Sequence, residues 1–249
     1  MCLHPRGDYV ADFVYAAGGK DQKVTADSSD SIYESKLRKE MLRILAENGD
    51  PDAVVLDIGG NIGLHTVFLA NAGYKVHVFE PFKGNFDLLK CTVMSNPQLA
   101  KNVVLNNFGL SDVAAKTCIV SNPTNHGGSV IQGSGTENCT AENTVEVRRL
   151  DDYLLEHQIK PYLVKIDVEG YEYKALSPAS TFFKENPPSH IFSEFVSKHF
   201  KEQGEAEAYL ELFYQLGYNV KWNENVVKKG SEKYSALMKA EFADIHMYQ

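Results

Sequence analysis

Acidic residues stand directly after several short apolar runs, where a carboxylate can bind hydroxyl groups, cations or a proton. They are Asp57, Glu80, Asp167, Glu169 and Glu194. If the apolar runs are strands of an open parallel sheet, ligands bind beyond the carboxyl ends of those strands. The spacing therefore predicts that the five carboxylates border one crevice at a single edge of the sheet.

The sharpest signal is a glycine-rich turn that reads Asp57-Ile58-Gly59-Gly60-Asn61-Ile62-Gly63. Glycine permits positive φ and lets a ligand approach the backbone, and the helix that follows offers free N–H groups. A nicotinamide-binding loop would read G-x-G-x-x-G, whereas Asn61 occupies the second glycine position here. An acid at Asp57 disfavours a pyrophosphate and suits an ammonium group, such as that of an amino acid.

Glu80 lies 21 residues after Gly59, at the end of the second predicted strand. An acid at about this distance from the glycine turn binds the two hydroxyl groups of an adenosine ribose. An ammonium site beside Asp57 and a ribose site beside Glu80 together describe S-adenosylmethionine. The sequence therefore predicts this cofactor.

The segments that must position these residues alternate between strand and helix. We expect strands at 53–57, 75–79, 102–105, 162–166, 190–193, 218–222 and 243–248. Segments of helical periodicity separate most of them, which predicts βαβ units and a mostly parallel seven-stranded sheet with helices on both faces. The fold class is therefore α/β.

The alternation breaks between the third and fourth of these strands. Two short apolar runs at 118–120 and 145–147 predict an inserted antiparallel hairpin with a long loop at 122–143. Loops of this length are uncommon unless they are functional or disordered. Residues 1–30 lack periodicity and are expected to form a lead-in or flap, and residues 31–249 are expected to form one domain.

The composition of the chain indicates which kinds of partner and which cellular compartment to expect. The chain has 249 residues and a net charge of −8, which argues against nucleic acid as a partner. No run approaches the roughly 20 apolar residues of a membrane span, and the first residues lack an apolar signal segment. The four cysteines show no metal-binding spacing, so we expect free thiols in a reduced, cytoplasmic protein without a membrane partner.

Four segments carry a resemblance to a known family, at residues 55–63, 78–81, 109–112 and 164–172. The last reads Val-Lys-Ile-Asp-Val-Glu-Gly-Tyr-Glu and is the most specific. The segments resemble the FkbM-type methyltransferases over roughly residues 50–200. The resemblance implies a Rossmann-like class I methyltransferase fold and S-adenosylmethionine-dependent O-methylation of a hydroxyl on a sugar or small molecule.

The resemblance also implies a role for individual residues. Gly60 and Pro81 belong to the cofactor site, and Asp167 lies by the methyl-donor end. The methionine part would be lined by Asp57, Gly59, Asn61 and Gly63, the ribose would be bound by Glu80, and the adenine would be bordered by Gly109, Leu110, Ser111 and Asp112.

Methyl transfer from a sulfonium needs an aligned acceptor and a group that takes the hydroxyl proton. The candidate bases are Asp167, Glu169, Glu194 and His126. Lys165 lies inside a strand buried on both faces, so it must pair with a carboxylate or shift its pKa. We expect a pairing, with a direct catalytic role as the alternative.

Other interpretations stay open at this point. Asp167 and Glu194 could offer two oxygens to Mg²⁺, but no third ligand follows at a suitable spacing, so no metal is expected. Tyr171 and Phe195 stand next to the acidic edge and could stack on a sugar, although most aromatic side chains fill cores. A non-catalytic protein that binds the adenosyl cofactor on the same fold is the alternative function.

Overall fold

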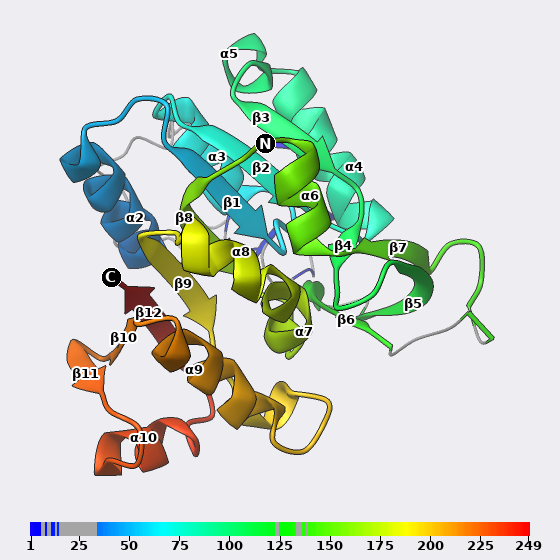
Figure 1. The fold of residues 1–249 in the computed structure, drawn as a ribbon. Helices are drawn as coiled ribbons and strands as arrows, with labels where there is room; N and C mark the ends of the chain where they lie inside the picture. Colours follow the sequence, from blue (N-terminus) through cyan, green and yellow to red (C-terminus); the bar gives the residue numbers. More distant parts are fainter. Residues whose placement is uncertain are drawn as a thin grey trace.

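A single eight-stranded sheet forms the centre of the described part of the chain (Figure 1). The computed structural model describes residues 1–5, 8, 11, 12, 14, 34–122, 125–132, 136, 137 and 139–249. The strands of this sheet are β1 (Val54–Ile58), β2 (Lys75–Phe79), β3 (Val103–Asn106), β8 (Pro161–Ile166), β9 (His190–Glu194), β10 (Asn219–Trp222), β11 (Asn225–Val227) and β12 (Asp244–Tyr248). Their spatial order is β11-β10-β12-β9-β8-β1-β2-β3.

Five neighbouring strands, from β9 to β3, are parallel, and β12, β10 and β11 extend the sheet with antiparallel pairings. This confirms the predicted α/β class and the mostly parallel sheet. The prediction of seven strands is wrong, because β11 adds an eighth. It follows β10 through a two-residue turn in which Asn223 and Glu224 have φ of 47° and 62°. Asn-Glu is a weak signal for such a turn, which explains the missed strand.

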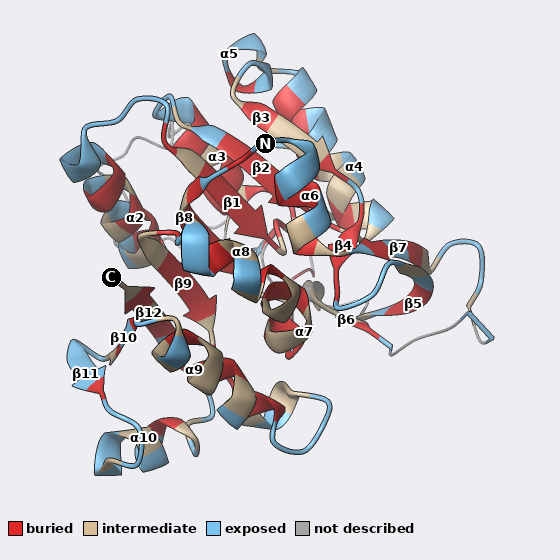
Figure 2. Cartoon of the chain, in the orientation of Figure 1, coloured by how far each residue is buried: buried red, intermediate tan, exposed pale blue. Residues whose placement is uncertain are grey.

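Helices cover both faces of the sheet. α2 (Ser35–Asn48), α3 (Leu64–Asn71), α4 (Lys83–Met94) and α5 (Pro97–Ala100) contribute to one core cluster. The other cluster takes residues from α6 (Leu150–Glu156), α7 (Glu172–Leu176), α8 (Ser180–Glu185), α9 (Glu205–Gln215) and α10 (Glu232–Leu237). The central strands are therefore buried on both faces, as Figure 2 shows, and this is why they read as continuous apolar runs.

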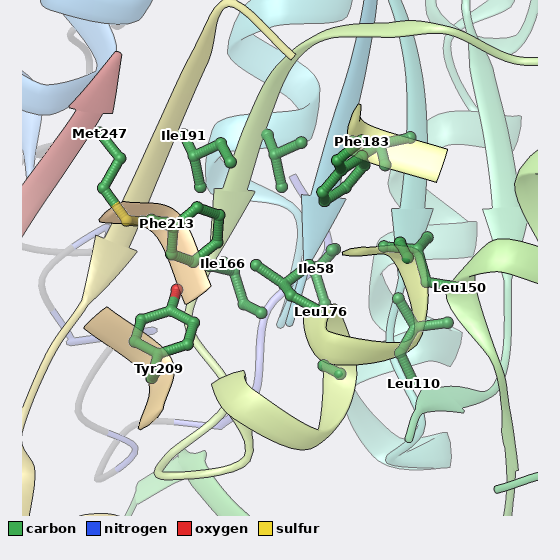
Figure 3. Packing of buried hydrophobic residues seen from close by; sticks show 14 of the residues in the cluster. Ile58, Leu110, Leu150, Ile166, Leu176, Phe183, Ile191, Tyr209, Phe213 and Met247 are labelled. Atoms are coloured by element: carbon green, nitrogen blue, oxygen red, sulfur yellow. The ribbon is translucent and has the colours of Figure 1, made fainter. Parts of the chain in front are cut away.

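The second cluster shows how the side chains fix the helices on the sheet (Figure 3). Tyr209 and Phe213 of α9 are fully buried, and the Tyr209 hydroxyl donates a hydrogen bond to Ser193 Oγ of β9 at 2.9 Å. Burying a side chain of this size contributes roughly 1.5–3 kcal/mol. Buried side chains of α9 thus pack against the sheet and position the carboxyl ends of its strands β8 and β9.

A smaller sheet replaces the predicted simple hairpin. It consists of β4 (Gly109–Leu110), β5 (Ala115–Asn122), β6 (Asn125–Ile131) and β7 (Thr144–Arg148), in the order β4-β7-β5-β6. The antiparallel pairing of β5 with β7 agrees with the predicted hairpin. The expectation of one loop over 122–143 is wrong, because β6 lies within it and pairs with β5. Asparagine and glycine are poor strand formers, so composition hid this strand.

The four cysteines form two disulfide bonds, which overturns the expectation of free thiols. Cys2 is bonded to Cys91 of α4, and Cys118 of β5 to Cys139, with Cα–Cα distances of 6.1 and 5.2 Å. The partners are 89 and 21 residues apart in the sequence, so only the fold brings them together.

The described residues near the N-terminus lie against α4 and β6. His4 Nε2 is 2.7 Å from Asn85 Oδ1, and Asp8 Oδ2 accepts a hydrogen bond from the His126 backbone N–H at 3.0 Å. Of the predicted lead-in over residues 1–30, residues 6, 7, 9, 10, 13 and 15–30 are outside the described residues. Within the described part of the chain, no helix is both long and apolar enough to span a membrane.

Candidate functional site

The glycine turn after β1 packs directly against the end of β8. Gly59 has φ of 81°, and a Cβ atom there would lie 1.9 Å from the carbonyl oxygen of Asp167. Only glycine fits this approach, because its φ and its lack of a side chain are both required. The turn therefore brings the ends of β1 and β8 together at the edge of the sheet predicted from the sequence.

Glu80 is positioned at the end of β2 by two backbone groups. Its Oε2 accepts a hydrogen bond from Asn61 N and its Oε1 from Phe82 N, both at 2.8 Å. Burial raises the pKa of Glu80 to about 7, against the opposing effect of these two hydrogen bonds. Each carboxylate oxygen keeps a further lone pair, so Glu80 can also accept hydrogen bonds from a ligand diol.

Asp57 and Lys165 form a buried charge cluster beneath the turn. Lys165 Nζ lies 3.4 Å from Asp167 Oδ2, 3.9 Å from Asp57 Oδ1 and 3.3 Å from the Gly59 carbonyl oxygen. The hydroxyl of Thr66 donates to Asp57 Oδ2 at 2.5 Å. Burial alone would lower the pKa of Lys165, but Asp167 and Asp57 raise it above its usual value. The predicted pairing of Lys165 with a carboxylate is confirmed.

A narrow cavity of about 50 Å³ lies between the turns after β1 and β2 and the small sheet. Of the residues predicted to bind the cofactor, this narrow cavity is lined by Gly59, Asn61, Glu80, Pro81, Gly109 and Leu110. Its other walls come from β5, β6 and the segment after β8, and they include Ile119, Ser129, Ile131, Val168 and Tyr171. The inserted β5–β6 hairpin is therefore a wall of the predicted cofactor site.

A central cavity of about 290 Å³ continues from the narrow cavity, with which it shares Gly59, Asn61, Asp167 and Glu169. Its other lining residues include Glu34, Gly60, His65, Lys165, Glu194 and His199. The structure thus gathers four of the five catalytic candidates around one space. The missing one is His126, whose Nδ1 lies 2.7 Å from Ser121 Oγ and whose ring packs between His4 and Phe82.

Two carboxylates and an imidazole meet in the central cavity. Ligand atoms of Glu169, Glu194 and His199 lie within 4.8 Å of one another. Burial, followed by the charge of Asp167, raises the pKa of Glu169 to about 7 and that of Glu194 to about 9. Such a group can share a proton, and its spacing would also suit a divalent cation. No sequence pattern predicts a role for His199, because only the folded chain brings this residue against the segment after β8, through a short turn.

The turn that carries Glu169 is stabilised by hydrogen bonds from its backbone to Glu172. Glu169 has φ of 55°, and Glu172 Oε1 accepts hydrogen bonds from Val168 N and Gly170 N at 3.1 and 3.3 Å. A Cβ atom on Gly170 would lie 2.0 Å from the His199 carbonyl oxygen, so glycine lets the His199 turn approach. The Gly-Tyr-Glu end of the 164–172 segment thus places Glu169 and His199 together.

An outer cavity of about 540 Å³ opens between α2 and the strands β8, β9 and β12. It shares Glu34, Lys165, Asp167 and Glu194 with the central cavity, so the two spaces meet at these residues. Glu34 precedes α2, has φ of 54° and lies 2.7 Å from His65 Nε2 through its Oε2. No motif predicts a role for Glu34, because this residue lies upstream of all four motif segments.

Some predicted residues lie away from the cavities. Asp57, Gly63, Ser111 and Asp112 line neither the narrow nor the central cavity. Asp57 is completely buried, and Gly63 packs against Leu89 of α4. Phe195 is also completely buried, and Tyr171 reaches only the narrow cavity, so neither forms an open stacking surface.

Comparisons with known proteins agree with this geometry. A domain model described as "Methyltransferase FkbM domain" matches residues 57–220, which is more than half of the chain. Hexuronic acid methyltransferase AglP of Haloferax volcanii is 29% identical over 164 residues, which cover 64% of each chain. The crystal structure of methyltransferase FkbM from Methylobacillus flagellatus KT matches with a TM-score of 0.51 at 15% identity, over 80% of this chain and 44% of that one.

The structural likeness supports the fold, and the domain match spans both the glycine turn after β1 and the carboxylate-bearing ends of β8 and β9. The chain therefore belongs to the FkbM methyltransferase family.

Proposed function

We propose that this protein transfers a methyl group from S-adenosylmethionine to a hydroxyl of a sugar or related small molecule. The observation that carries the proposal is the junction at Lys165, Asp167 and Glu194, where the central cavity meets the outer cavity. A transferase must bring two substrates together at one point, and this arrangement provides two adjoining spaces. The relative named as a hexuronic acid methyltransferase supports a sugar acceptor.

The residues of the narrow and central cavities fit the adenosyl cofactor. Glu80 would accept hydrogen bonds from the ribose hydroxyls, and the apolar walls at Leu110 and Ile131 suit the adenine ring. The backbone of Gly59 to Asn61 would border the methionine part. When bound, the cofactor supplies an electrophilic methyl group. Asp57 contributes indirectly, because it holds Lys165 beneath the turn.

We propose that the Glu169–Glu194 pair accepts the proton that the hydroxyl group of the acceptor loses during methyl transfer. The two carboxyl groups lie close together in the central cavity, and burial raises the pKa of Glu169 to about 7, near the pH at which proton transfer is most effective, and that of Glu194 further. The ion pair between Asp167 and Lys165 would position the reacting groups where the two cavities meet. In this proposal Glu169 and Glu194 bind the proton and not a divalent cation, although their spacing with His199 would suit one, so dialysis against EDTA should leave turnover unchanged.

The test is calorimetric titration with S-adenosylmethionine, S-adenosylhomocysteine and NADH, followed by transfer of labelled methyl groups to a panel of sugars. Binding of the two adenosyl ligands together with labelled product is the expected result. Binding without transfer to any sugar would favour the non-catalytic alternative. Failure of both adenosyl ligands to bind would overturn the proposal.

The disulfide bonds also bear on where the protein acts. Disulfides persist in oxidising compartments and are rare in the reducing cytoplasm. Since both cysteine pairs are bonded, we propose an oxidising compartment in place of the cytoplasm expected from the sequence.

A further inference from the structure

A row of rings crosses the sheet beside α2, leading away from the reaction centre. The rings of Phe192 and His246 are stacked, with centroids 4.1 Å apart and an interplanar angle of 13°. The ring centroids of His246 and His190 are 5.2 Å apart. Tyr162 and Tyr248 continue the row, at 5.7 Å from His190 and 5.3 Å from His246. These residues come from β8, β9 and β12, which are neighbours in the sheet.

The row of rings connects the outer cavity to another open space. This far cavity, of about 430 Å³, is lined by Tyr162, His190 and Tyr248 together with residues of α2 and of the β10–β11 turn. It shares five lining residues with the outer cavity, namely Glu40, Arg43, Lys221, Glu224 and His246. The two cavities therefore adjoin and form one elongated groove, which begins at Asp167 and Glu194.

The sides of this elongated groove carry both donors and acceptors of hydrogen bonds. On α2, Arg43 Nη2 lies 2.8 Å from Glu40 Oε1, and at the β10–β11 turn Lys221 Nζ lies 2.5 Å from Glu224 Oε2. These ion pairs are partly exposed, so their remaining lone pairs and N–H groups can bind hydroxyl groups. A sugar ring presents hydroxyls at its edge and C–H groups on its faces, which matches polar sides above a floor of rings.

We propose that the acceptor is an oligosaccharide, and that the elongated groove binds several of its sugar units. This inference rests on the proposed function and adds the length of the acceptor to it. The unit to be methylated would occupy the outer cavity near Asp167 and Glu194. The next units would lie over the rings in the far cavity. Each cavity falls within the roughly 300–1,000 Å³ of typical small-molecule sites, so each has room for separate units.

The experiment measures methyl transfer from labelled S-adenosylmethionine to neutral glycans of one to six units. We expect chains of three or more units to be methylated with a kcat/KM roughly tenfold above that of the matching monosaccharide, since two ring contacts are added. The double variant Tyr162→Ala/Tyr248→Ala should remove this preference and leave kcat/KM for the monosaccharide unchanged. The variant Tyr162→Phe/Tyr248→Phe should retain it.

Phe242→Ala is the matched control, because Phe242 is 55% exposed and lines none of the cavities described above. Equal kcat/KM values for all chain lengths, or a preference that survives the double alanine variant, would overturn the inference while leaving the proposed function intact. Absence of methyl transfer to every glycan, despite cofactor binding, would instead count against the proposed function.

Discussion

Lys165 is the residue on which the charge balance of the site depends. It is buried between Asp57 and Asp167, and Asp57 is itself fully buried. Removing one partner of a buried ion pair leaves an uncompensated charge and costs about 3–5 kcal/mol. We therefore expect Lys165→Met to lower the free energy of unfolding by about that amount, as measured by urea denaturation. Lys160→Met, at an exposed position, is the control. If both variants lowered the free energy of unfolding by the same amount, Lys165 would not stabilise the buried carboxylates.

Glu80 provides a separate prediction about affinity. At about pH 8, above the pKa of about 7, Glu80 carries a charge that strengthens hydrogen bonds to the ribose hydroxyls, and Glu80→Gln keeps the shape of the side chain but removes this charge. Hydrogen bonds to charged groups contribute about 1.5–3 kcal/mol, so the Kd for S-adenosylhomocysteine should rise by about ten- to a hundredfold. Calorimetry measures this change, with the exposed Glu156→Gln as control. An unchanged Kd would remove Glu80 from the cofactor site.

The pH dependence of turnover follows from Glu169. Burial and the neighbouring Asp167 raise the pKa of Glu169 to about 7, whereas Lys201 and Lys165 oppose the shift. A base must be ionised to accept a proton, so kcat should rise with pH up to about 7 and then level off. Glu169→Gln should abolish this rise together with most of the turnover. A kcat that is flat between pH 5 and 8 would exclude Glu169 as the base.

At the scale of elements, the β5–β6 hairpin forms one wall of the narrow cavity that we propose for the adenosine part of the cofactor. The narrow cavity holds only about 50 Å³, and Ile119 and Ile131 of the hairpin form part of its wall. Ligand sites usually provide roughly 300 Å³ or more, so we infer that the hairpin shifts when adenosine enters. We expect S-adenosylhomocysteine to change hydrogen exchange in 125–131 and to leave β3 unchanged. Ligand binding without any change in the hairpin would refute this.

The elements also show where prediction from the sequence succeeds. The five parallel strands were predicted within one or two residues, because burial on both faces gives each a continuous apolar run. β4, β6 and β11 were not predicted, since pairing with a neighbouring strand stabilises them more than their own composition does. Elements at the edges of sheets depend on tertiary partners, and local patterns carry little of that information.

For the whole molecule, the disulfide between Cys2 and Cys91 closes a long segment of chain. A cross-link over 89 residues stabilises a fold by about 4–5 kcal/mol in the chain-entropy model. Cys2→Ser/Cys91→Ser should therefore lower the free energy of unfolding by a large part of this amount. Urea denaturation of that variant, compared with the parent protein with and without reductant, measures the effect. Free thiols detected in the unreduced parent would contradict the pairing.

The candidate site is also a property of the whole molecule. Glu80, Gly59 and Asp167 of the motif segments line the narrow cavity, because each follows a strand of the parallel sheet, and their roles stay predictions. The motif segments could not predict Glu34, which reaches the same junction as Asp167 from more than a hundred positions upstream. His126 was misplaced for the complementary reason, since the strand that carries it was not recognised.

The origin of the cavity walls along the chain has a consequence for how this enzyme family can diversify. The narrow cavity is built entirely from residues between Ile58 and Tyr171, whereas much of the outer cavity comes from α2 and from residues after position 220. On the proposed function, the middle of the chain would bind most of the methyl donor, and the two flanks would bind much of the acceptor. Substitutions confined to those flanks would then change which molecule is methylated and leave binding of the methyl donor largely intact.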